Sequence, residues 1–129
     1  MSDASLAGIH VLVVEDDEDA LEMLTTVLEG SGASVTRAAS VPEAFAAFRR
    51  ARPDVVVSDV RMPIESGYDL VRRIRALSVD EGGAIAIIAV SAEMHLERHA
   101  GPRSSEFTAF VRKPVEIDAL LRVVALHAS

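Results

Sequence analysis

The sequence contains no cysteine among its 129 residues, which excludes disulfides, thiolate catalysis and cysteine metal sites. It is also short of basic residues, because 13 Lys and Arg stand against 20 Asp and Glu, for a net charge of −7. This balance argues against non-specific binding to nucleic acid or to an anionic membrane, since both require a basic face. No apolar run approaches the ~20 residues of a membrane helix, and the opening MSDASLAGIH lacks the pattern of a secretory signal. We therefore expect a soluble cytoplasmic domain.

The chain has enough length and apolar content for one core. Half of its residues are hydrophobic and 26% are charged, as in ordinary globular domains. A chain of 129 residues suits one compact domain and is short for two. Because it contains no repeat, low-complexity tract or linker, we predict a single domain over residues 1–129, with its core between about residues 9 and 126.

Short, apolar and largely β-branched runs recur along the chain, as expected for strands covered on both faces. They occur at residues 10–14, 33–38, 54–58, 84–90 and 107–111. Segments with helical spacing of apolar residues follow these runs. Five apolar strands alternating with helices predict an α/β fold with a parallel sheet, and right-handed crossovers would place helices on both of its faces.

Helix signals appear in several of the intervening segments. Ser40 with Glu43, and Ser66 with Asp69, have the spacing of capping boxes at the starts of two helices. The predicted helices include residues 40–53, 66–77 and 116–126. Between the fourth and fifth strands we expect a short helix that ends near residue 100, followed by an irregular segment. We interpret the arginines at positions 72, 73 and 75 as the solvated face of one helix.

Polar side chains follow four of the predicted strands. Ligands of an open parallel sheet bind beyond the carboxyl ends of its strands, so these residues should meet at one edge. They are Glu15, Asp16, Asp17, Asp59, Ser91 and Lys113. Singly, such residues are most often helix caps or surface groups. Together, the carboxylates suit Mg²⁺, one of them can accept a phosphoryl group, and the hydroxyl and ammonium can share its charge. The combination predicts phosphoryl transfer to Asp59.

These residues stand in motifs that resemble the receiver domains of response regulators in two-component signalling. The motifs are VLVVEDD (11–17), VVVSDVRMP (55–63), Gly67, AVSA (89–92) and FVRKP (110–114). The resemblance implies a flavodoxin-like (βα)5 three-layer sandwich whose five-stranded parallel sheet has the strand order 2-1-3-4-5. It also implies phosphorelay signalling rather than a turnover enzyme, with a histidine kinase or histidine phosphotransfer domain as the phosphodonor.

The resemblance assigns roles at the site. Asp59 corresponds to the phosphoacceptor, and Glu15 and Asp16 to the acidic pair. Mg²⁺, for which Mn²⁺ is the alternative, would be held by Asp16 and Asp59 with the backbone carbonyl of Arg61. Lys113 corresponds to the phosphate-binding lysine.

Further positions correspond to the conformational switch and to the control of phosphoryl lifetime. Ser91 and Phe110 stand at the switch positions, and the peptide before Pro114 is commonly cis in the family. Arg61 and Glu93 stand where receivers tune dephosphorylation, and we hypothesise that they pair across the mouth of the site.

Three other interpretations compete with that of a working receiver. An Mg²⁺-dependent aspartyl-phosphate hydrolase typically has an acid where this chain has Arg61. A nucleotide-binding domain is disfavoured because the first strand–helix turn, EDDEDA, contains no glycine. A degenerate receiver acting as a phosphorylation-independent docking module stays as the alternative.

The sequence leaves open whether the receiver stands alone or comes from a larger protein such as a hybrid histidine kinase. It also leaves open the downstream protein partner. The irregular segment 101–106 puts conventional dimerisation of receivers in doubt, because it breaks the helix that commonly contributes to that surface.

Overall fold

The computed structural model describes residues 5–62, 64–92 and 106–128. Five parallel strands form one sheet in the order β2-β1-β3-β4-β5. The strands are β1 (His10–Val14), β2 (Ser34–Ala38), β3 (Val55–Asp59), β4 (Ala86–Ser91) and β5 (Ala109–Arg112). The predicted flavodoxin-like fold class and the strand order are therefore confirmed.

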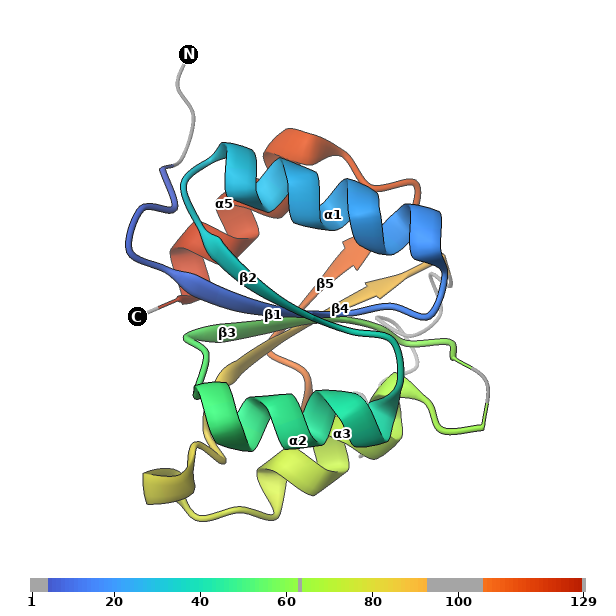
Figure 1. Ribbon diagram of the computed structural model, residues 1–129, viewed down its shortest axis with the longest axis vertical. Helices are drawn as coiled ribbons and strands as arrows, with labels where there is room; N and C mark the ends of the chain where they lie inside the picture. The colour runs from blue at the N-terminus through green and yellow to red at the C-terminus, as the bar shows by residue number, and fades with distance from the viewer. Residues whose placement is uncertain (1–4, 63, 93–105, 129) are drawn as a thin grey trace.

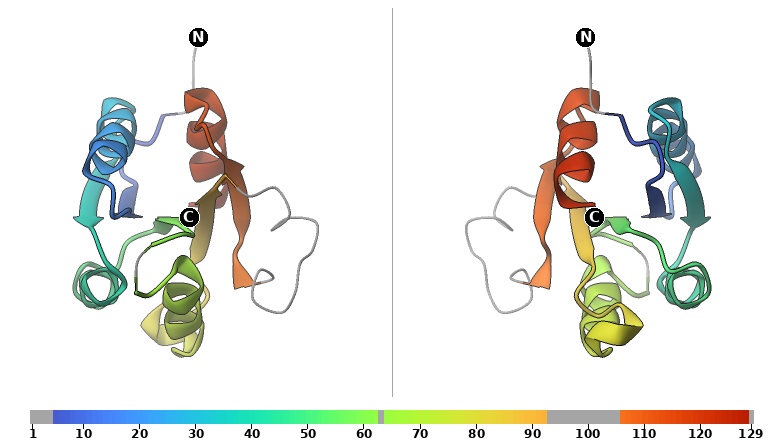
Figure 2. Two further views of the ribbon diagram at one scale, coloured as in Figure 1. Left: turned by 90° about the vertical axis from the view of Figure 1, so that its right-hand side faces the viewer. Right: turned by 90° about the vertical axis from the view of Figure 1, so that its left-hand side faces the viewer.

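Helices cover both faces of the sheet. They are α1 (Glu18–Gly30), α2 (Val41–Ala51), α3 (Gly67–Arg75) and α5 (Ile117–His127), with a short 3-10 turn, η1 (Val79–Glu81). α1 and α5 lie on one face and α2 and α3 on the other, which gives the three-layer sandwich (Figures 1 and 2). The helix expected before residue 100 lies outside the described residues. Within the described part of the chain, no helix is long and apolar enough to cross a bilayer.

The sheet separates two hydrophobic cores. Alternate side chains of a strand point to opposite faces, so neighbouring valines of β3 belong to different cores. Val56 packs in the core beneath α2 and α3, which is filled by Phe48. Val55 and Val57 pack in the core beneath α1 and α5. Because both faces are covered, β3 is buried along its whole length.

The capping predictions for α2 and α3 have different outcomes. Ser66 and Asp69 form the predicted capping box. The Ser66 hydroxyl accepts a hydrogen bond from the backbone of the first turn of α3, and the Asp69 carboxylate accepts one from the backbone N–H of Ser66. The hydroxyl of Ser40 accepts a hydrogen bond from the backbone N–H of Glu43 at 3.3 Å. The carboxylate of Glu43, however, accepts from the N–H of Ala39 at 2.9 Å, one residue before the expected donor. The reciprocal half of the box predicted at Ser40 is therefore wrong.

Arg75 is not the surface residue that its helical position suggested. Its guanidinium is half-buried and donates hydrogen bonds to the backbone carbonyls of Gly83 (2.8 Å), Ile85 (2.6 Å) and Glu106 (3.1 Å). Burial lowers the pKa of Arg75 from its ordinary value. The side chain thus links the end of α3 to the segments that precede β4 and β5. Arg72 and Arg73, in contrast, make surface ion pairs, as expected for a solvated helix face.

Candidate functional site

The carboxyl ends of the central strands bring the predicted polar residues to one edge of the sheet. Strand pairing aligns Val14 with Ser58 and Asp59 with Val90, so the segments after β1, β3 and β4 begin side by side. Asp59 is the last residue of β3 and Ser91 the last of β4, and both side chains are buried. Strand geometry therefore fixes these two residues more firmly than a loop would.

Three carboxyl groups converge at this edge. Glu15, Asp16 and Asp59 each offer an oxygen atom, and these atoms lie within 4.8 Å of one another. Glu15 is the most enclosed, with only 2% of its surface exposed. Its Oε2 accepts a hydrogen bond from the N–H of Asp17 at 3.1 Å, whereas its buried Oε1 has no hydrogen-bond partner among the described residues. Apart from an ion pair with Lys113, this buried oxygen has no partner among the described residues, and a carboxylate satisfied only in part suits a bound cation.

The ammonium group of Lys113 lies beside two of the three carboxyl groups. Lys113 Nζ lies 3.2 Å from Asp59 Oδ1 and 3.6 Å from Glu15 Oε1. Partial burial alone would lower the pKa of Lys113, but the two carboxylates outweigh it and raise that pKa above its ordinary value. The peptide between Lys113 and Pro114 is cis.

Glu15 has a shifted pKa. Burial, the largest influence, raises the pKa of Glu15 from 4.5 to about 7, and the neighbouring charge of Asp59 adds to the rise. The hydrogen bond from Asp17 and the charge of Lys113 oppose it without cancelling it. The charge of Lys113 therefore offsets the burial of the Glu15 carboxylate only in part.

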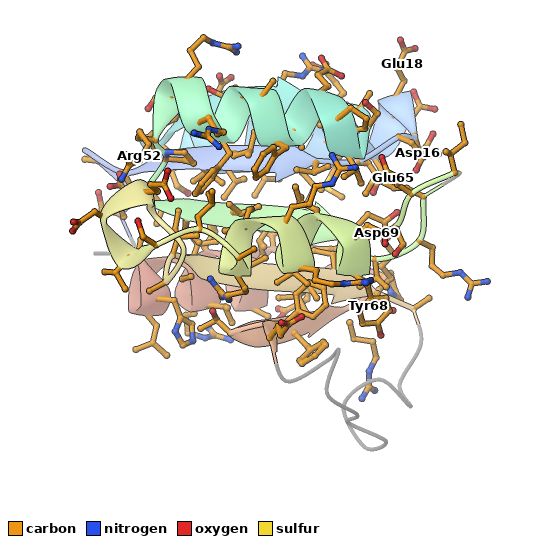
Figure 3. All side chains as sticks on the ribbon, turned by 90° about the horizontal axis from the view of Figure 1, so that it is seen from below. Asp16, Glu18, Arg52, Glu65, Tyr68 and Asp69 are labelled. Carbon is orange, nitrogen blue, oxygen red and sulfur yellow. The ribbon has the colours of Figure 1, made fainter. Side chains whose placement is uncertain are left out.

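An open cleft of about 440 Å³ leads to the cluster. It is lined by Glu15, Asp16, Asp17, Asp59, Arg61, Ala92 and Lys113. Figure 3 shows that Asp16 lies at the same end of the sheet as Glu65, in the β3–α3 connection, and Asp69, in α3, with Arg52 at the opposite end. The hard oxygen donors, the space for water or phosphate and the Glu15 oxygen that lacks a hydrogen bond all suit Mg²⁺, which usually takes few protein ligands.

The remaining predicted residues lie around this cleft. Ser91 is linked to the lysine segment, because its carbonyl accepts a hydrogen bond from the backbone N–H of Lys113 at 2.9 Å. Phe110 is half-buried on β5, with its ring centroid 5.6 Å from that of Phe107. Arg61 is exposed at the cleft. Glu93, and therefore its hypothesised pairing with Arg61, lies outside the described residues.

The close approach of α3 to the site depends on Gly67. A Cβ atom at this position would lie 2.6 Å from the carbonyl oxygen of Asp59 and 3.0 Å from Val60 Cα. Only glycine lets the start of α3 pack directly against the strand end that carries Asp59. The sequence reasoning noted Gly67 as part of a motif but could not assign this contact, because it joins residues from two elements.

The chain is similar to known proteins of one family. Residues 11–125 match the family of response regulator receiver domains. A 14.6 kDa protein from Leptolyngbya boryana, otherwise uncharacterised, is 37% identical over 120 residues, which are 93% of this chain and 90% of that protein. The probable transcriptional regulatory protein TcrX of Mycobacterium tuberculosis is 34% identical over 119 residues, and these are 92% of this chain but 49% of TcrX.

A solved structure with a bound magnesium ion resembles the fold of this chain. The receiver domain of sensor histidine kinase PA1611 from Pseudomonas aeruginosa has a magnesium ion coordinated in its active-site cleft. It superposes with a TM-score of 0.80 at 28% identity, covering 94% of this chain and 98% of that one.

The fold and the acidic cleft define a signalling module of the two-component class. The chain belongs to the family of response regulator receiver domains. Receivers accept phosphoryl groups from histidine kinases and are not turnover enzymes, so the hydrolase and nucleotide-binding interpretations do not apply.

Proposed function

We propose that the protein accepts a phosphoryl group on Asp59 from a phosphohistidine of a kinase or phosphotransfer domain. In this step the P–N bond of the phosphohistidine breaks, the bond between phosphorus and an Asp59 carboxylate oxygen forms, and the imidazole leaves. The observation that carries the proposal is the position of Asp59 at the rigid end of β3, with Lys113 Nζ 3.2 Å from one of its oxygens. A fixed carboxylate beside a fixed ammonium suits attack on a charged phosphoryl group.

The divalent ion forms part of the proposal. Glu15, Asp16 and Asp59, with the backbone carbonyl of Arg61, would hold Mg²⁺ or Mn²⁺, and its bound charge would offset that of the phosphoryl oxygens. The Oε1 of Glu15, which has no hydrogen bond among the described residues, and the raised pKa of this carboxyl group support the assignment. Lys113 contributes by holding its ammonium beside both buried carboxylates.

We propose that Ser91 and Lys113 bind the phosphoryl group once it is on Asp59, and that Phe110 changes position in response. The backbone hydrogen bond between Lys113 and Ser91 supports joint movement of the two segments. The cis peptide at Pro114 belongs to the same segment. Such a two-state change would alter the surface that a downstream protein partner reads.

Control of phosphoryl lifetime is assigned to Arg61 and Glu93. Arg61 lines the cleft, where a long side chain can limit the entry of water to the acyl phosphate. The variants Arg61→Ala and Glu93→Ala should both shorten the phosphoryl lifetime by admitting water, and unchanged or longer lifetimes would refute the role. We place the whole exchange in the cytoplasm, within one domain spanning residues 1–129.

The decisive test is intact-mass measurement after incubation with the small-molecule donor phosphoramidate and Mg²⁺. Wild type should gain one phosphoryl group, and Asp59→Asn should gain none. Asp80→Asn, an exposed aspartate in η1, is the matched control and should behave as wild type. The gain should disappear when EDTA replaces Mg²⁺. A folded wild type that gains nothing under conditions that preserve acyl phosphates would favour the docking-module alternative.

A further inference from the structure

Ile64, in the connection between β3 and α3, has a backbone conformation that isoleucine rarely adopts. Its φ is +70°, in the left-handed region, where β-branched side chains are genuine outliers. Among the described residues, Arg52 is the only other non-glycine with positive φ. The side chain of Ile64 is also fully exposed, at 103% relative accessibility. Packing in the fold therefore does not explain why an isoleucine occupies this strained position.

The surrounding connection holds this conformation in place. The N–H of Gly67 donates to the carbonyl of Val60 at 2.9 Å, which closes the connection at its base. Glu65, the next residue after Ile64, forms an ion pair with Arg73 on α3 at 2.7 Å. Ser66 then caps the helix. Asparagine or glycine would satisfy the same backbone with less strain, so the local structure does not account for an isoleucine at this position.

The position of Ile64 relates it to the phosphoacceptor. It lies five residues after Asp59, in the same connection as Arg61, which lines the cleft. The neighbouring Glu65 appears in Figure 3 at the end of the molecule that carries Asp16. Scattered apolar residues on a surface are ordinary, but a strained one beside a reaction site points to a role there.

The charge around the cleft indicates the chemistry of a partner. Residues 1–36 contain eight acidic residues and no Lys or Arg. Asp16, Asp17, Glu18 and Asp19 are all exposed beside the cleft or at the start of α1. A partner that brings a phosphoryl group to this end of the sheet therefore meets an acidic surface with the exposed Ile64 side chain at its border. Basic residues on that partner would be complementary to this surface.

We propose that Ile64 is an apolar anchor for the phosphohistidine protein that phosphorylates Asp59, inserting into an apolar socket bordered by basic side chains. The inference rests on the proposed function, since it concerns the partner in that reaction. A side chain held rigidly in the required orientation loses little freedom on binding, which makes the strained conformation useful for recognition. Burial of one isoleucine side chain corresponds to roughly a 10- to 100-fold effect on association.

The test compares phosphorylation by a protein with phosphorylation by a small molecule. The protein donors are the purified, autophosphorylated transmitter domains of the source organism's histidine kinases, from which the fastest donor to wild type is chosen. The small donor is phosphoramidate, which needs no socket. The variants are Ile64→Asn, which fits the left-handed backbone without the apolar group, and Ile64→Leu, which keeps the apolar group. Val79→Asn is the control, because this exposed valine belongs to η1, which lies at the amino-terminal end of the strands, away from the cleft (Figure 1).

We expect Ile64→Asn to lower kcat/KM for transfer from the transmitter by roughly 10- to 100-fold, mainly through KM. Its rate with phosphoramidate should stay at the wild-type value, and its thermal stability should equal or exceed that of wild type. Ile64→Leu and Val79→Asn should transfer close to wild type. This pattern requires a contact with the protein donor, because a structural defect would slow both donors.

Three results would overturn the anchor role. One is transfer to Ile64→Asn at the wild-type rate, and another is an equal loss with both donors. The third is the absence of transfer from any transmitter while phosphoramidate labels Asp59. If ultracentrifugation shows self-association that Ile64→Asn abolishes without affecting transfer, a second copy of the chain occupies the anchor instead. Failure of phosphoramidate to label wild type would refute the proposed function itself, which keeps the two failures distinct.

Discussion

Substituting Glu15 by glutamine should stabilise the metal-free protein at alkaline pH and have much less effect at acid pH. The pKa of Glu15 is raised to about 7 in the folded protein from an ordinary value of 4.5. Between these values the folded state binds more protons than the unfolded state, so stability falls as pH rises through this window. Glutamine keeps an oxygen that can accept the hydrogen bond from Asp17 but removes the buried charge. The gain from the substitution should therefore appear as the pH is raised.

The magnitude follows from the two pKa values. A difference from 4.5 to about 7 corresponds to a limiting destabilisation of roughly 3 kcal/mol above pH 7. Glu15 titrates together with Asp59 and beside Lys113, so we expect the advantage of Glu15→Gln to grow by about 1–2 kcal/mol between pH 5 and pH 8.

Urea unfolding at both pH values in EDTA measures the effect. Glu29→Gln, which removes an exposed carboxylate of α1, is the control and should show no comparable pH dependence. Repeating the series with MgCl₂ should stabilise wild type more than Glu15→Gln at pH 8, because a bound cation offsets the buried charge. A stability difference between wild type and Glu15→Gln that is equal at pH 5 and pH 8 would refute the reasoning.

Three substitutions test other contacts, each by urea unfolding at pH 7. Gly67→Ala should cost about 1–3 kcal/mol, because its Cβ would collide with the Asp59 carbonyl at 2.6 Å, and a neutral result would show that α3 can shift freely. Arg75→Ala should cost about 2–3 kcal/mol by leaving three carbonyls without their donor. Arg75→Lys should recover only part of this, since an ammonium lacks the planar fork, and full recovery would contradict the geometry. Ser66→Ala should cost about 1 kcal/mol through loss of the capping box, and no loss would argue that water replaces the cap.

The strands could be predicted from sequence because they are buried on both faces. The run HVLVV coincides with β1, and the other four runs overlap their strands with ends displaced by one or two residues. Phe107 illustrates the displacement, since it was assigned to the fifth strand but lies before β5 and packs in the core beneath α2 and α3. An apolar run indicates burial, and residues just outside a strand can be as buried as those within it, so the run does not fix where the strand ends.

Contacts between distant backbone groups were beyond sequence reasoning. Arg75 has the spacing of a solvated helix face, yet its guanidinium binds carbonyls that lie 8, 10 and 31 residues further along the chain. η1, with its own capping box at Ser78, was not anticipated because three residues are too few for a periodic pattern. The polar residues at the strand ends were easier to place together, because the parallel topology alone brings them to one edge.

The two cores on opposite faces of the sheet have a consequence for how the site responds to substitutions in either core. β3 alternates between them, with Val56 on one side and Val57 on the other, and it ends at Asp59. A cavity in the core beneath α1 or in the core beneath α2 would therefore weaken the packing that holds the Asp59 carboxylate in position, each from its own face of the sheet. A single inserted residue in this strand would exchange the two sets of valines between the cores and turn the acid away from its lysine. The alignment of one functional oxygen is thus a property of both halves of the molecule at once.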